Sequence, residues 1–177
     1  APNFSVIGAQ HSCALTNKLN VKCWGAGGSG QLGSAVASAP ITAPVTVPIA
    51  DKIQMVAAGP YHTCALTIAG AVKCWGANSA GQLGNGTTTG SSSPVDVVGI
   101  VGTAIGIAVA EAHTCAVTAA SEVYCWGDNT YGQLGSAPGT SPVPTNFTTA
   151  QHMTRTWPTS NSVSSIAASY RNSCLTL

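Results

Sequence analysis

The sequence predicts an all-β fold built from a repeated unit of about 51 residues. The first cysteine of each copy falls at positions 13, 64, 115 and 174, so the spacings are 51, 51 and 59 residues. Short apolar segments alternate with turn-forming residues, and no segment shows the periodicity of a helix. Glycine and proline are frequent, with 20 and 10 residues respectively, as expected of a chain rich in turns.

Roughly three and a half copies of one pattern follow each other along the chain. The first three copies each contain His-Ser/Thr-Cys-Ala, then Cys-Trp-Gly, then Gly-Gln-Leu-Gly, in residues 6–33, 56–84 and 107–135. A fourth copy opens at Ile166, and Leu177 falls within its first hairpin. With the connectors included, the predicted units are residues 1–50, 51–101, 102–160 and 161–177.

Each copy is predicted to contain a β-hairpin. In the second copy, a strand at His62–Thr67 and a strand ending at Trp75 flank a short turn that contains Gly70. This is the usual signature of two antiparallel strands. Equivalent hairpins are predicted at residues 11–24 and 113–126. The connectors at residues 39–48, 87–94 and 137–149 are rich in proline and threonine, and we expect them to form edge strands and loops.

The pattern H-[ST]-C-A-[LV]-T, C-W-G and G-Q-L-G resembles the repeat of the regulator of chromosome condensation family. The resemblance covers nearly the whole chain except the connectors, and it implies β-propeller blades of about fifty residues and four strands. Such a ring usually has about seven blades. The chain departs from the pattern at Gly27, where later copies have Asn78 and Asn129, and at Asn172, where they have histidine. The resemblance implies a fold and leaves the function open.

Six of the seven cysteines form pairs ten residues apart. Residues so spaced lie opposite each other across a tight hairpin, within reach of a disulfide. The alternatives are free thiols or a zinc site that uses His11 with its neighbouring cysteines, although zinc usually takes four ligands at shorter spacing. We expect disulfides, no metal and no cofactor, and therefore an extracellular or cell-surface location. The predicted pairs are Cys13–Cys23, Cys64–Cys74 and Cys115–Cys125.

Cys174 has no partner at this spacing. An odd cysteine in an oxidised protein indicates intermolecular pairing, a free thiol or sequence that continues further. We therefore expect the incomplete fourth unit to be completed by another chain or by missing sequence.

Two aromatic residue types recur at fixed repeat positions, and we predict that both belong to the repeat core. Recurring histidines could also bind a metal or respond to pH, and recurring tryptophans could stack on sugars. Glutamines in the G-Q-L-G turns are expected to satisfy backbone groups between blades. These positions are His11, His62, His113, Trp24, Trp75, Trp126, Gln31, Gln82 and Gln133.

Composition excludes several classes of function. Charged residues make up 6% of the chain and the net charge is +1, which cannot supply a nucleic-acid-binding patch. No stretch reaches the ~20 apolar residues of a membrane span. No catalytic motif is present, and the five carboxylates do not recur as a pair, so we predict no enzyme. Sequons at Asn3, Asn85 and Asn146 are candidate glycosylation sites.

Two functions remain. The first is a non-enzymatic structural module of an extracellular assembly or filament, because a half-built blade leaves an edge open to pairing. Its partner would be another copy or another extracellular protein. The alternative is a secreted binding module or protein inhibitor that uses face loops, with Asp128, Tyr131 and Trp157 as contacts. Exchange on a small GTPase is implied by the family resemblance alone, and the paired cysteines and the absence of a basic tail argue against it.

Overall fold

The computed structural model describes residues 5–35, 40–135, 146–153, 163, 165–170 and 172–176, and within them it contains β-strands and no helix. The all-β prediction is therefore confirmed. Asn3 and Trp157 lie outside the described residues.

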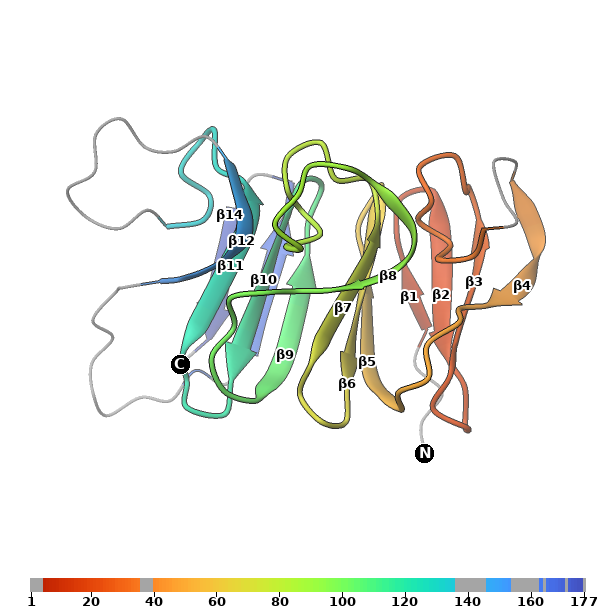
Figure 1. The fold of residues 1–177 in the computed structure, drawn as a ribbon, viewed down its shortest axis with the longest axis horizontal. Coiled ribbons are helices and arrows are strands. Elements are labelled where there is room, and N and C mark those ends of the chain that lie inside the picture. Colours follow the sequence, from red (N-terminus) through yellow and green to blue (C-terminus); the bar gives the residue numbers. More distant parts are fainter. Residues whose placement is uncertain are drawn as a thin grey trace.

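The strands form three four-stranded antiparallel sheets and one two-stranded sheet (Figure 1). In each sheet the strands follow chain order. We call the sheets blades 1 to 3 and the half-blade. Blade 1 contains β1 (Ser5–Ile7), β2 (His11–Leu15), β3 (Val21–Gly25) and β4 (Ile41–Thr46). Blade 2 contains β5 (Ile53–Ala58), β6 (His62–Thr67), β7 (Val72–Gly76) and β8 (Ser91–Asp96). Blade 3 contains β9 (Ala104–Val109), β10 (His113–Thr118), β11 (Val123–Asp128) and β12 (Asn146–His152), and the half-blade contains β13 (Ser165–Ser169) and β14 (Asn172–Thr176).

The second and third strands of each blade form the predicted hairpin. Its turn requires a left-handed backbone, which Gly70 adopts with φ of 83°. Leu19 and Ser121 occupy the same position in blades 1 and 3, each with φ of 62°. Glycine is the residue that tolerates this conformation at no steric cost, so the turn geometry is kept in blades 1 and 3 at the expense of local strain.

Disulfides join the two strands of each hairpin at their centre. The register places Cys13 opposite Cys23 and aligns the equivalent pairs of blades 2 and 3 in the same way. In all three pairs the Cα atoms are 4.1 Å apart. The bonded pairs are those that the ten-residue spacing predicts, namely Cys13–Cys23, Cys64–Cys74 and Cys115–Cys125.

The connectors supply the outer strand of each blade. β4, β8 and β12 pair with the tryptophan-bearing strand, and the register shifts just before its glycine, as between Cys74 and Gly76. Most residues of β4 and β8 are exposed or half-buried. Pro44 and Pro94 lie in these outer strands, where a missing backbone N–H interrupts no central ladder.

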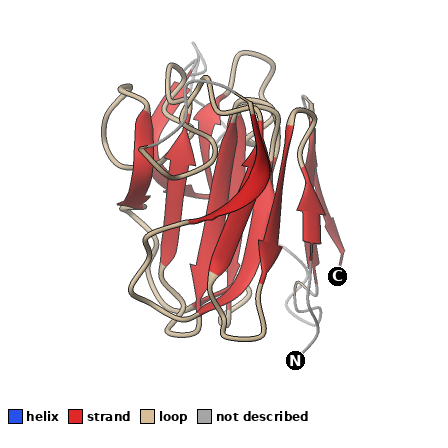
Figure 2. Ribbon diagram, turned by 90° about the vertical axis from the view of Figure 1, so that its right-hand side faces the viewer, coloured by secondary structure: helices blue, strands red, loops and turns tan. Residues whose placement is uncertain are grey.

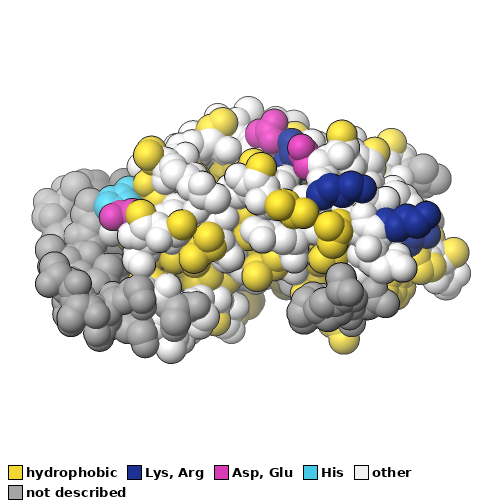
Figure 3. Space-filling view, turned by 90° about the horizontal axis from the view of Figure 1, so that it is seen from below, with side chains coloured by type: hydrophobic (Ala, Val, Ile, Leu, Met, Phe, Trp, Pro, Cys, Tyr) yellow, Lys and Arg dark blue, Asp and Glu magenta, His cyan; other side chains and the backbone are white. Residues whose placement is uncertain are grey.

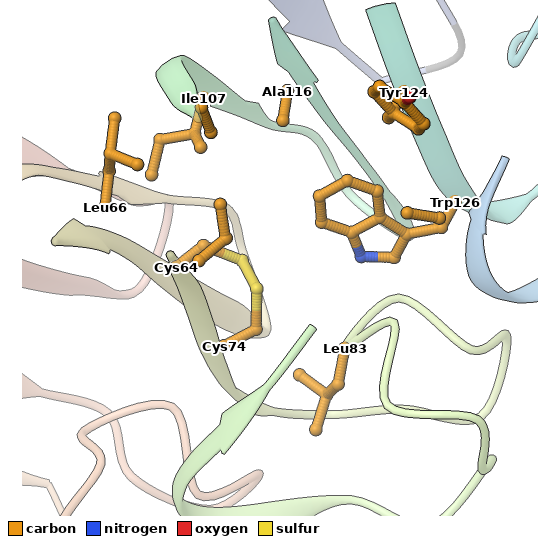
Figure 4. Packing of buried hydrophobic residues seen from close by; sticks show 11 residues of the cluster. Cys64, Leu66, Cys74, Leu83, Ile107, Ala116, Tyr124 and Trp126 are labelled. Carbon is orange, nitrogen blue, oxygen red and sulfur yellow. A yellow bond between two sulfur atoms is a disulfide. The ribbon is translucent and has the colours of Figure 1, made fainter. Parts of the chain in front are cut away.

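The hydrophobic core lies between neighbouring blades, which follow one another in a row (Figure 1). Figure 2 views this row from the side of blade 1. One buried cluster combines Leu66, Cys74 and Leu83 of blade 2 with Ile107 and Trp126 of blade 3 (Figure 4). An equivalent cluster joins blades 1 and 2 around Trp75. Because each blade completes the core of its neighbour, a single blade has little core of its own.

The disulfide pattern predicts one reactive thiol per chain. Alkylation of the denatured, unreduced chain should modify Cys174 alone, because the other six cysteines are bonded. Reduction should then raise the intact mass by about six hydrogens, as measured by mass spectrometry. An unreduced chain that takes up seven alkyl groups would contradict the three disulfides.

Candidate interaction site

The joint between blades is built on a histidine of one blade and a threonine of the next. Thr63 Oγ1 in blade 2 donates to the backbone carbonyl of Gln31 at 3.0 Å. Its only proton is then used, so His11 Nε2 in blade 1 must donate to this oxygen, which lies 2.6 Å away. All three groups are buried. These groups form a chain of two hydrogen bonds, from His11 to Thr63 and from Thr63 to the carbonyl of Gln31, which we call the relay.

The relay repeats at the joint between blades 2 and 3. His62 Nε2 lies 2.8 Å from Thr114 Oγ1, which donates to the carbonyl of Gln82 at 3.1 Å. At the third joint, His113 Nε2 lies 3.0 Å from Ser173 Oγ in the half-blade. The half-blade is therefore attached to blade 3 by the same histidine contact that joins the complete blades.

A tryptophan of the following blade adds a further hydrogen bond to each complete joint. Trp75 Nε1 donates to the carbonyl of Gln31 at 2.9 Å, and Trp126 Nε1 donates to that of Gln82 at the same distance. Both indoles are fully buried. One glutamine carbonyl thus accepts from both the threonine and the tryptophan of the next blade, which uses both of its acceptor positions.

The glutamine side chains act differently from the prediction. We expected them to satisfy backbone groups between blades, but Gln31 Oε1 accepts from Ser29 N at 2.8 Å within its own loop. Gln82 and Gln133 do the same with Ala80 N and Tyr131 N, at 2.9 Å each. The side chain holds the loop in shape, and the backbone carbonyl makes the contact between blades.

On the face of blade 1 that points away from blade 2, the chain has the tryptophan and hydroxyl residues that blades 2 and 3 use in their joints. Trp24 is half-buried, in contrast to Trp75 and Trp126, because no described blade covers it. Ser12, which takes the position of Thr63, is half-buried as well. The predicted core role of Trp24 is therefore only partly realised within the described chain. The hydroxyl and indole positions of a further joint face outward here.

Burial keeps the three histidines neutral. It lowers the pKa of His11 to about 4, and burial together with the neighbouring His113 and His11 lowers the pKa of His62 to about 3. Burial also lowers the pKa of His113. Since Nε2 carries the proton of the relay, Nδ1 is the bare nitrogen, and it has no partner in any of the three rings among the described residues. At His113 the nearby Asp128 carboxylate and a backbone hydrogen bond with Asn172 oppose the effect of burial in part, whereas nothing of this kind acts at His11 or His62.

The described residues offer no metal site. No three histidine, cysteine or acidic side chains among them gather closely enough to hold an ion. The inner strands β1, β5, β9 and β13 end around a hollow of about 210 Å³, in which Glu111 is the one charged lining residue among those described. No helix in the described part of the chain is long and apolar enough to cross a membrane.

The remaining predicted site residues lie on the surface. Tyr131 is 61% exposed in the loop after β11, and Asp128 Oδ1 accepts a hydrogen bond from Thr130 in the same loop. Asn146 is exposed at the start of β12. Asn85 is half-buried, and its Oδ1 accepts from Thr87 Oγ1 of its own sequon at 2.9 Å. On the face drawn in Figure 3, charged side chains are few, which matches the low charge of the sequence.

The relay predicts a specific cost for removing one hydroxyl. Thr63→Val keeps the shape but leaves the buried His11 Nε2–H without an acceptor. We expect it to lower the free energy of unfolding by about 1–3 kcal/mol, measured by urea denaturation. Thr46→Val, at an exposed position in β4, is the matched control and should change stability little. Equal losses in the two variants would contradict the relay.

The buried histidines predict that the fold weakens in mild acid. The folded pKa values of His11 and His62, about 4 and about 3, lie well below the 6.5 of an unperturbed histidine, so the unfolded chain binds more protons below that pH. Between pH 7 and pH 5, His11 and His62 should each lower the free energy of unfolding by about 2 kcal/mol. His62→Asn introduces the residue that the half-blade has at Asn172. It should lower by about one the number of protons that the chain takes up on unfolding, and so make stability less dependent on pH. Equal stability of the unmodified chain at both pH values would contradict the prediction.

Comparison with known proteins places the repeat pattern in a family. The profile described as "Regulator of chromosome condensation (RCC1) repeat" matches residues 21–66, 69–117 and 121–175, and a second profile of the same description matches residues 6–31, 53–82 and 106–133. The chain is 37% identical over 133 residues to the ultraviolet-B receptor UVR8 of Arabidopsis thaliana, covering 72% of this chain and 30% of the receptor. It is 36% identical over 145 residues to the probable E3 ubiquitin-protein ligase HERC6 of Homo sapiens, covering 78% of this chain and 14% of the ligase. The chain thus spans less than a third of these relatives.

Solved structures support the same architecture. Human WBSCR16 superposes with a TM-score of 0.84 at 24% identity, covering 98% of this chain and 44% of that structure. Yeast RCC1 (Prp20), solved with Kap60, superposes with a TM-score of 0.83 at 20% identity, covering 96% of this chain and 40% of that structure. At this identity the likeness concerns the fold, and it confirms a partial β-propeller. The profile matches, which cover most of the sequence, show that the chain belongs to the regulator of chromosome condensation (RCC1) repeat family.

Proposed function

We propose that this chain is a non-enzymatic structural module of an extracellular assembly or filament, whose half-blade is completed by another chain or by further sequence. The observation that carries the proposal is the inter-blade joint, which is complete between blades 1 and 2 and between blades 2 and 3. On the face of blade 1 that points away from blade 2, the described residues supply only half of such a joint. Trp24 and Ser12 present one half on blade 1. A surface that repeats half of an internal interface is suited to a partner with the other half, in a head-to-tail contact.

The surface composition supports self-association. Only 6% of the residues are charged and the net charge is +1, so little electrostatic repulsion keeps copies apart. Exposed apolar side chains add to this tendency, as the exposed fractions of Ile7 (82%), Val101 (74%) and Ile68 (56%) illustrate.

Three hairpin disulfides support an extracellular location, because such bonds persist in oxidising compartments. The sequon at Asn146 begins an outer strand and is exposed, so a glycan could be attached without unfolding a blade.

A second candidate function is a secreted binding module that uses the loops of one face. Tyr131 favours it, because this large aromatic side chain is 61% exposed in a loop whose neighbouring Asp128 is held by Thr130 and Gln133. Aromatic residues on an ordered loop are common anchors of protein interfaces.

The native mass separates the two functions. Light scattering after size-exclusion chromatography should give particles heavier than the single chain of 17.6 kDa, and their mass should rise with protein concentration. Trp24→Ala should reduce the assembled fraction because it removes the outward-facing indole of blade 1. Tyr131→Ala is the control on the face loop and should leave the mass unchanged. A mass of one chain at every concentration would contradict the assembly proposal.

A further inference from the structure

The segment between β7 and β8 forms a second contact between blades 2 and 3, besides the relay. Gly86 N donates to the backbone carbonyl of Thr148 in β12 at 2.8 Å. Asn85 forms an isolated antiparallel bridge with Thr149 in the same strand. Both contacts connect a segment of blade 2 to the outer strand of blade 3, so they exist only while the two blades are joined.

Asn85 and Gly86 are the only Asn-Gly pair in the sequence. In such a pair the backbone nitrogen of the second residue can attack the side-chain amide of the first and close a succinimide ring. Glycine hinders this attack least, because it has no Cβ atom. Gly86 is exposed and Asn85 is half-buried, so water reaches the pair. Deamidation is therefore the chemistry to which this pair is suited.

Three groups of blade 2 donate hydrogen bonds to Oδ1 of Asn85. Thr87 contributes its backbone N at 3.2 Å and its hydroxyl at 2.9 Å. The buried Asn78 contributes Nδ2, which lies 3.2 Å away. Attack on the amide carbon turns Oδ1 into an oxyanion, and donors that are already aimed at this oxygen stabilise that state. Blade 2 by itself therefore activates the Asn85 amide.

Blade 3 holds back the nitrogen that would attack. Gly86 N must lose its proton and face the side chain of Asn85, but its N–H is directed at the carbonyl of Thr148. Thr148 is half-buried, so breaking this bond leaves a partly desolvated carbonyl without its donor, which is costly. The activating groups and the restraining group thus belong to different blades. Opening of the joint removes the restraint and leaves the activation in place.

We propose that Asn85 is a deamidation site whose reaction is gated by the joint between blades 2 and 3. The closed joint restrains Gly86 N, and a local opening of the joint releases it. Opening is reversible, whereas the loss of the amide is permanent, so a modified Asn85 records that the two blades have separated. The inference is independent of the proposed assembly function, because every group that it uses lies within one chain.

The reaction needs no reagent besides water and hydroxide. A hydroxide ion removes the proton of Gly86 N, and this nitrogen forms a bond to Cγ of Asn85. The bond between Cγ and Nδ2 then breaks, and Nδ2 takes up a proton from water and leaves as ammonia, which restores the hydroxide. Water adds to one carbonyl of the succinimide and breaks its bond to the ring nitrogen, which gives aspartate or isoaspartate.

The products alter the contact between the blades. Isoaspartate inserts an additional methylene into the main chain just before Gly86, which moves that nitrogen away from Thr148. Either product adds a carboxylate, which lowers the net charge of the chain from +1 to zero. A joint that closes after isoaspartate has formed therefore lacks the hydrogen bond from Gly86.

The first measurement compares Asn85 in the folded chain with the same residue in a free peptide. The oxidised chain, prepared without N-glycans, and the peptide of residues 83–89, L-G-N-G-T-T-T, are incubated in the same mildly alkaline buffer. Peptide mapping separates asparagine from aspartate and isoaspartate and gives both rates. We expect the chain to react about tenfold more slowly, because the bond from Gly86 must break first. Equal rates would overturn the inference.

Two matched histidine variants locate the gate. His62→Asn weakens the relay between blades 2 and 3, and His11→Asn weakens the equivalent relay between blades 1 and 2. We expect Asn85 to deamidate about tenfold faster in His62→Asn and at the unmodified rate in His11→Asn. Hydrogen exchange at the Gly86 N–H, which measures opening itself, should show the same contrast.

The other outcomes of this comparison contradict the gate. Equal acceleration in the two variants means that the reaction proceeds through unfolding of the whole chain, and no acceleration in either means that it does not depend on the joint. Circular dichroism checks that each variant folds. Thr114→Val and Thr63→Val remove the hydroxyls of the same two relays, and they form a second pair with the same expected contrast.

Variants at Thr87 test the activation separately from the gate. In the His62→Asn chain, Thr87→Val removes the hydroxyl donor to Asn85 Oδ1 and should slow deamidation by about tenfold. Thr87→Ser keeps a hydroxyl and should leave the rate unchanged. The same substitutions in the free peptide correct for the local effect of the side chain. An unchanged or faster reaction in Thr87→Val would show that this contact does not activate the amide, and the inference would fail.

Discussion

The structure depends on one backbone carbonyl per joint, that of the glutamine in the G-Q-L-G loop. In each complete joint this oxygen accepts one hydrogen bond from a threonine and one from a tryptophan of the following blade. The threonine oxygen in turn accepts from a histidine of the first blade. Since these groups are buried, losing any one would leave another without a partner, which is costly in a low-dielectric interior. The repeated residues are therefore coupled across blades rather than within them.

This coupling explains why different residues of the repeat stabilise the hairpin, the loop and the contact between blades. The disulfide holds the hairpin together, and the loop glutamine side chain holds the loop, so that both halves of a joint are shaped within one blade. The apolar core then forms between blades, around Trp75 and Trp126. In such a row stability comes largely from contacts between neighbouring blades, and a blade at the end of the described row has these contacts on one side only. Trp24 of blade 1 illustrates this, because no described blade covers it and it is half-buried, whereas Trp75 and Trp126 are fully buried.

Local features could be predicted from the sequence, whereas the joint could not. The hairpins, their turns and the cysteine pairs join residues within about a dozen positions, where turn chemistry and strand geometry set the contact. The recurrence of His11 and Trp75 indicated a core role, but their partners, Thr63 and the carbonyl of Gln31, lie 52 and 44 positions away. Every residue has a backbone carbonyl, so the sequence does not indicate which carbonyl accepts the hydrogen bonds of the joint. For that reason the glutamine side chain was wrongly expected to make the contact.

The same reasoning shows that the two sides of a joint are chemically different. The following blade contributes donors, the threonine hydroxyl and the indole N–H, whereas the preceding blade contributes the glutamine carbonyl and the histidine. Trp24 and Ser12 of blade 1 stand at the donor positions and are half-buried, since no described blade covers them. A surface that presents the donors of a joint is complementary to a G-Q-L-G loop and not to a second copy of itself, so any contact on this face is of the head-to-tail kind.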